Sequence, residues 1–146
     1  MVHRPTILER QGDNMCSWLR TLGFGFLVWL IPFVVAVGLS GVRETNRPLF
    51  ESIMPVVVTV SVVACSLIYF PHVRSEWAKE AARLGVIWMI ISLVIDLPLM
   101  LNPPISMTCI EYIHDVGITY LIIPAVTVGM GLAIGRANRA SGDGAA

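Results

Sequence analysis

The chain has 146 residues, of which 55% are hydrophobic and 14% are charged, and its formal net charge is zero. Soluble domains contain about 45–50% apolar and about 25% charged residues, whereas the mean hydropathy here is +0.75. These values exclude a disordered chain, a collagen and a coiled coil, argue against a soluble enzyme, and provide no net positive charge for nucleic-acid binding. A small integral membrane protein remains.

Four stretches are apolar enough to cross a bilayer, which takes about 20 residues for about 30 Å of hydrocarbon. They cover residues 21–42, 49–70, 84–101 and 107–135. Backbone in lipid must form its own hydrogen bonds, and these runs are continuous rather than alternating, so they predict helices and not a β-barrel. Short links favour an up-down order. The predicted fold is an all-α, four-helix antiparallel transmembrane bundle over residues 21–135, between a cytoplasmic segment 1–20 and a cytoplasmic tail 136–146.

Positive charge is distributed unequally between the two ends of this predicted bundle. Of the ten Lys and Arg residues, only Arg43 and Arg47 lie at the end opposite the termini. The positive-inside rule therefore places both termini and the loop between the second and third spans in the cytoplasm. We expect a multi-pass protein of the plasma (inner) membrane, with the lipid bilayer as its surroundings. The first span is about twice as long as a signal-peptide apolar run, so we expect it to be retained.

Three cysteines lie at different predicted depths, at Cys16, Cys65 and Cys109. An intramolecular disulfide needs two cysteines close together, so none is expected. The simplest interpretation is that all three are small apolar fillers. The alternative is a bridge between two copies through Cys109.

Four ionisable residues fall at similar depths near the outer end of the predicted bundle. Asp96 lies in the third span, and Glu111, His114 and Asp115 lie in the first third of the fourth. Charged groups in a span cost at least about 2.5–3.5 kcal/mol and normally face the bundle interior. Glu111, His114 and Asp115 share one helical face, because positions three and four apart lie on the same side. We therefore expect an outward-facing acidic pocket formed by all four.

Three interpretations of this pocket stay open. In the first it is structural, with neutral or hydrogen-bonded carboxyl groups. The candidate donors are Thr59, Ser92, Tyr112, Thr119 and Tyr120. In the second it binds a cation or proton on a translocation pathway, as acidic residues in spans often do. In the third, the Glu-x-x-His step of Glu111 and His114 holds a metal ion such as Fe, Mn or Zn, completed by Asp115 and Asp96. No other cofactor is expected.

Small residues on the fourth span form two steps that allow close helix packing. They are Ala125-xxx-Gly129 and Gly131-xxx-Gly135. Ala125 and Gly129 continue the face of Glu111, so the pattern indicates a buried surface between helices. The Gly131-xxx-Gly135 step fits internal packing and a dimer interface equally. A homodimer or a second membrane protein is therefore a candidate partner.

The stretch from Tyr112 to Pro124 reads Tyr-Ile-His-Asp-Val-Gly-Ile-Thr-Tyr-Leu-Ile-Ile-Pro and continues through Val128-Gly129. It resembles the last span of small prokaryotic four-span integral membrane proteins of unknown function. In these proteins a Tyr-Ile-x-Asp-x-Gly-x-Thr-Tyr-Leu-x-Ile-Pro run precedes a glycine-rich helix. The resemblance covers about a fifth of the chain and implies no activity. The positions that it singles out are Asp115, Gly117, Thr119, Tyr120 and Pro124.

No arrangement of residues typical of an enzyme is evident. The chain lacks a phosphate-binding glycine loop, a His-Glu-x-x-His step and a nucleic-acid motif. We therefore expect a non-enzymatic membrane protein whose acidic cluster handles or transports a cation or proton. The alternative is an accessory or interaction subunit of a membrane complex.

Overall fold

The computed structural model describes residues 7–73, 76–102 and 108–143. Throughout these ranges the secondary structure is helical, without a strand. Its α-helices are α1 (Ile7–Gly38), α2 (Ser40–Thr45), α3 (Arg47–Tyr69), α4 (Trp77–Leu101), α5 (Cys109–Tyr112) and α6 (Ile122–Asp143). A 3₁₀ turn, Phe70–His72, extends α3. Between α5 and α6 lie a π-helix, Ile113–Gly117, and a 3₁₀ turn, Thr119–Leu121.

Four of these segments are long and apolar enough to cross a membrane. They are Trp18–Gly38, Arg47–His72, Trp77–Leu101 and Thr119–Ser141. Their mean hydropathies of 2.1, 2.3, 2.3 and 1.5 explain why each folds as a helix, since only a helix satisfies its own backbone in lipid. The prediction of an all-α, four-helix transmembrane bundle is confirmed. Two helices are longer than the predicted spans. α1 already begins at Ile7, and α6 continues to Asp143.

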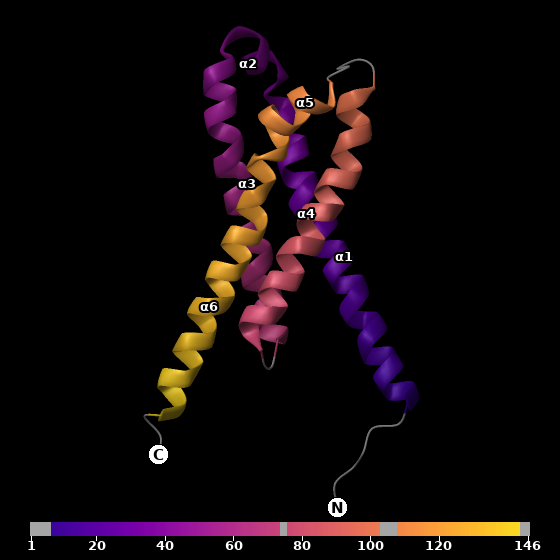
Figure 1. Cartoon of the computed structure of the whole chain (residues 1–146), viewed down its shortest axis with the longest axis vertical. Helices are drawn as coiled ribbons and strands as arrows, with labels where there is room; N and C mark the ends of the chain where they lie inside the picture. The colour runs from indigo at the N-terminus through magenta and orange to yellow at the C-terminus, as the bar shows by residue number, and fades with distance from the viewer. Residues whose placement is uncertain (1–6, 74–75, 103–107, 144–146) are drawn as a thin grey trace, which may run out of the picture.

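The helices run antiparallel, and the two ends of the bundle differ (Figure 1). At one end, here called the loop end, lie α2 and α5. At the other, the terminal end, lie both chain termini and the connection from α3 to α4 (Figure 1). α1 and α6 diverge from each other toward the terminal end (Figure 1). The bundle is therefore most compact in its middle and toward the loop end.

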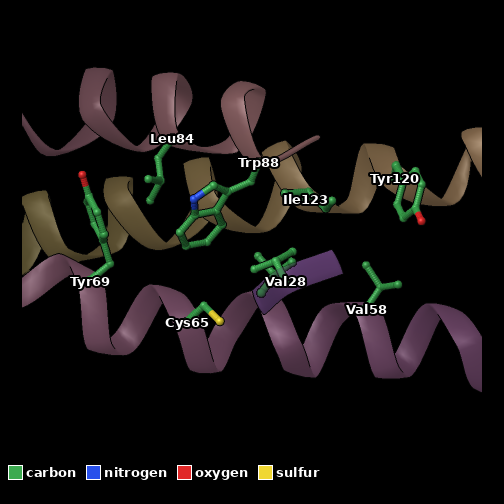
Figure 2. Packing of buried hydrophobic residues seen from close by; sticks show 9 residues of the cluster. Val28, Val58, Cys65, Tyr69, Leu84, Trp88, Tyr120 and Ile123 are labelled. Carbon is green, nitrogen blue, oxygen red and sulfur yellow. The ribbon is translucent and has the colours of Figure 1, made fainter. Parts of the chain in front are cut away.

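A single apolar core joins the four spans in the middle of the bundle (Figure 2). It consists of Val28, Val58, Val62, Cys65, Tyr69, Leu84, Trp88, Tyr120 and Ile123. Trp88 is fully buried, and its indole N–H donates to the carbonyl of Thr21 at 3.0 Å. This bond gives the polar atom of the largest core side chain a partner, as a buried group requires.

Glycines allow the closest helix contacts. A Cβ atom built on Gly131 of α6 would meet the Ala81 side chain and, at 2.7 Å, the Trp77 carbonyl oxygen of α4. One built on Gly85 of α4 would meet Thr127 and, at 2.7 Å, the Cα of Pro124. α4 and α6 therefore pack backbone to backbone, which small residues permit in membranes.

Candidate functional site

Among the acidic side chains that the structure describes, Asp96 is the buried one, with 3% of its surface exposed. It lies on α4 and accepts hydrogen bonds from three aromatic side chains. The Tyr120 hydroxyl donates to Oδ2 at 3.1 Å, and the Tyr112 hydroxyl donates to the same oxygen at 3.5 Å. The Trp29 indole N–H on α1 donates to Oδ1 at 3.4 Å. Asp96 thus connects α1, α4 and the segment that leads into α6.

The π-helix explains how both tyrosines reach one carboxyl group. Tyr112 and Tyr120 are eight residues apart, which in a regular α-helix would separate their directions by roughly 80°. In the π-helix the N–H of Ile118 donates to the carbonyl of Ile113, five residues back, at 3.1 Å. A π turn accommodates one extra residue. The two tyrosines are therefore brought toward the same face, and both are buried.

A partly open cavity of about 110 Å³ adjoins Asp96 on the loop-end side of the core. Most of its lining is apolar, including Phe33, Phe50 and Met54, and Asp96 and Tyr120 are also lining residues. Arg43 and Glu51 line it as well. Glu51 pairs with Arg47 at 2.6 Å, and the Arg43 guanidinium lies 5.7 Å from the centre of the Phe50 ring. The cavity therefore combines one deeply buried acid with an apolar wall and charged groups near the loop end.

The tyrosine hydroxyls give this site two modes of hydrogen bonding. A hydroxyl donates to an ionised carboxylate, and after rotation it can accept a hydrogen bond from a protonated one. Asp96 can therefore keep a hydrogen bond with a tyrosine hydroxyl in either protonation state.

Glu111 and His114 do not join Asp96, contrary to the expected pocket. Glu111 is exposed, and its carboxylate accepts hydrogen bonds from the backbone N–H of Thr108 at 2.8 Å and from the Thr108 hydroxyl at 2.9 Å. These two bonds hold the pKa of Glu111 below its usual range, and the bond from the backbone N–H contributes more. His114 is also exposed, and the Asp115 side chain lies outside the described residues. Glu111 therefore serves as half of a capping box that begins α5.

The face assignment of the fourth span was wrong for a related reason. The face that carries Glu111 and His114 continues through Ala125 and Gly129, and these four residues are exposed. The face that packs into the bundle is instead the one of Tyr112, Tyr120, Ile123, Thr127 and Gly131. Large aromatic side chains and one extra residue in the π-helix set this register, and neither follows from the positions of the polar and small residues.

The two small-residue steps therefore behave differently. Gly131 is buried against α4, and a Cβ on Gly135 would lie 3.6 Å from that of Trp77. This step belongs to internal packing. A Cβ on Gly129 would have no atom within 4 Å, and Ala125 is exposed. Within the described chain, Ala125-xxx-Gly129 is consequently not a surface between helices.

Two of the five expected hydrogen-bond donors, Tyr112 and Tyr120, contact Asp96. Thr59 and Ser92 instead donate to carbonyl oxygens of their own helices, at 2.7 Å to Pro55 and 3.0 Å to Trp88. Trp29 was not among the donors expected from the sequence. Its indole N–H, one of the few donors in the first span, was the available signal.

Among side chains that the structure describes, no group of three or more His, Cys, Asp or Glu residues gathers closely enough to hold a metal ion. The Glu111 and His114 step thus has no third ligand within the described residues. A scan against protein-family models and searches of curated proteins and of solved structures found no match for this chain. The chemistry of the site is therefore inferred from its own geometry.

Proposed function

We propose that this multi-pass membrane protein binds and releases a cation, either a proton or a small organic ammonium ion, at Asp96. The observation that carries the proposal is a buried acidic residue that lines a cavity and whose carboxyl group is held by donors from separate segments. Acidic residues inside membrane spans are costly and commonly mark proton or ion pathways. The proposal assigns no catalytic role to any residue.

The lining of the cavity supports an organic cation over a hydrated metal ion. Apart from Asp96, Tyr120 and three further polar residues, the wall is formed by apolar side chains such as Phe33 and Met54. Hard metal ions prefer several oxygen ligands, whereas an ammonium ion with an apolar body gains from one carboxylate and aromatic faces. A bound ammonium ion would replace the proton of Asp96, so binding and proton release should be coupled.

Access to the site is one-sided in this conformation. Val58 and Tyr120 line the cavity, and the core residues Trp88 and Ile123 lie beyond them, toward Tyr69 (Figure 2). Transport would require this core to open, and the prolines within α1 and α3, Pro32 and Pro55, are places where a helix can bend. The excess of basic residues at the terminal end supports an orientation with both termini in the cytoplasm, and in a plasma membrane the cavity would then face outward.

The test measures tetraethylammonium binding and proton release by the purified full chain in mild detergent. Wild type should bind the cation, release a proton in weakly buffered solution, and bind more tightly as the pH rises. Asp96→Asn should weaken binding about tenfold or more and abolish proton release. Glu51→Gln is the matched control, because it also removes a carboxyl group from the cavity wall, and it should change binding less than threefold.

Two results would overturn this proposal. One is equal binding by wild type and Asp96→Asn. The other is the absence of both cation binding and reversible protonation of Asp96, read from its carboxyl infrared band, across pH 4 to 9.

A second candidate function, an interaction subunit or homodimer, rests on the exposed Ala125 and Gly129 face of α6. A small-xxx-small step exposed to lipid suits close approach by another helix. Gly129→Leu should then abolish a specific crosslinked complex in membranes. Gly23→Leu is the control, because Gly23 is also exposed with no atom near its Cβ position. A monomer that forms no complex in wild-type membranes would exclude this function.

A further inference from the structure

A groove at the terminal end is lined by the beginning of α4 and the last turns of α6, and its volume is about 610 Å³. Its lining includes Trp77 and Lys79 of α4 together with Gly135, Arg136 and Arg139 of α6. The last turns of α6 run past the beginning of α4 at this end of the molecule (Figure 1). A Cβ atom on Gly135 would lie 3.6 Å from that of Trp77, so the two helices are in contact beside the groove.

The charge of this groove is positive. Lys79 forms an ion pair with Glu76 at 2.7 Å, and Glu76 is the single acidic residue that lines the groove. One positive charge is therefore neutralised. Neither Arg136 nor Arg139 forms an ion pair with another residue of the described ranges, and both are exposed. They are three positions apart on one helix and therefore point to neighbouring parts of its surface. Two guanidinium groups thus lack a neutralising partner within the described chain, and a guanidinium is well shaped to bind a phosphate through two parallel hydrogen bonds.

The groove lies where lipid headgroups lie. Trp77 is the first residue of the span Trp77–Leu101, and Arg136 and Arg139 fall in the last turns of the span Thr119–Ser141. Tryptophan at the end of a span is typical of the membrane–water interface. Leu132, 44% exposed, also lines the groove one turn deeper into the membrane than Arg136. The groove therefore offers cationic groups for a headgroup and an apolar surface for an acyl chain.

We propose that this groove binds an anionic phospholipid, with its phosphate at Arg136 and Arg139 and an acyl chain along Leu132. A free phosphate ion would gain the electrostatic attraction but not the apolar contact. Basic pockets between transmembrane helices bind anionic headgroups in this way. The inference does not depend on Asp96, since the two sites lie at opposite ends of the bundle.

The test uses the full chain in nanodiscs that contain phosphatidylglycerol and phosphatidylcholine in a one-to-three ratio, followed by extraction in mild detergent and native mass spectrometry. Wild type should retain phosphatidylglycerol about tenfold over its share of the mixture. The double variant Arg136→Gln/Arg139→Gln should lose most of this enrichment. The double variant Arg43→Gln/Arg47→Gln removes the same charge at the loop end, and it should keep the enrichment within twofold.

Three results would overturn the proposal. The first is retention of both lipids in proportion to the mixture. The second is equal loss of enrichment in both double variants, which would indicate non-specific charge attraction. The third is displacement of phosphatidylglycerol by inorganic phosphate at a concentration similar to that of the lipid, which would indicate a free-anion site.

Because the exposed arginines do not contribute to the core, tetraethylammonium binding at Asp96 should be unchanged in Arg136→Gln/Arg139→Gln.

Discussion

The hydroxyl of Ser66 is fully buried in α3 and has no hydrogen-bond partner among the described residues. An unsatisfied buried polar atom destabilises the folded state by about 1–3 kcal/mol. Ser66→Ala should therefore leave stability unchanged or raise it by about 1 kcal/mol, measured by thermal unfolding in mild detergent. Ser92→Ala is the comparison, because Ser92 is equally buried but donates to the Trp88 carbonyl. A larger loss for Ser66→Ala than for Ser92→Ala would contradict the expectation.

Tyr120 makes the shortest hydrogen bond to Asp96, at 3.1 Å compared with 3.5 Å for Tyr112. Tyr120→Phe keeps the ring in the core and removes only the hydroxyl, so it should lower the free energy of unfolding by about 1–2 kcal/mol. Tyr112→Phe should cost less. A double-mutant cycle with Asp96→Asn should give a coupling of about 1 kcal/mol for Tyr120. Additive effects would show that the hydroxyl does not act through Asp96.

Glu111 links the stability of the loop end to pH. Its pKa is lowered in the folded chain by the bonds from Thr108, so the ionised form stabilises the fold at any pH above the ordinary carboxyl value. This contribution is lost as the pH falls from the ordinary carboxyl pKa through the lowered one. The difference in melting temperature between wild type and Glu111→Gln should therefore shrink across that range. A constant difference would mean that Glu111 does not titrate with folding.

At the scale of helices, the close contact between α4 and α6 depends on glycines, of which Gly131 is the clearest test. Gly131→Ala adds a Cβ atom that meets Ala81 and the Trp77 carbonyl oxygen, so the two helices must separate. We expect a loss of about 1–3 kcal/mol and a lower melting temperature. Gly129→Ala should be neutral or slightly stabilising, since its Cβ has open space and alanine favours a helix. Equal effects of the two variants would argue against this close packing.

The number of membrane-spanning helices was predictable from sequence, but the buried face of the last one was not. Continuous apolar runs suffice to define spans, so Asp96 was also correctly placed inside a helix near one end. The π-helix at Ile113–Gly117 shifts the register by one residue, and no composition rule locates such a turn. The prediction placed the polar face of Glu111 inside the bundle. In the structure Glu111 forms the capping box at the beginning of α5, and its neighbour Tyr112 is buried instead.

For the molecule as a whole, the structure gives an antiparallel bundle, and the distribution of charge predicts its orientation. Cys109 is a free, exposed thiol at the loop end, whereas Cys65 is buried. If the termini are cytoplasmic, a membrane-impermeant maleimide applied to intact cells should label wild type, and Cys109→Ser should remove this label. Labelling of Cys109 only after the cells are opened would place the loop end in the cytoplasm and reverse the orientation.

The hydrogen bonds of Asp96 also have a consequence for the order in which the protein is made. The chain is synthesised from its N-terminus, so α4 enters the membrane before Tyr112 and Tyr120 exist. Until then Trp29 alone of the three donors is present, and the carboxyl group opposes the lipid insertion of α4 by about 2.5–3.5 kcal/mol. Synthesis of the final span supplies the two missing donors. Asp96 thereby ties stable insertion of the third span to completion of the chain.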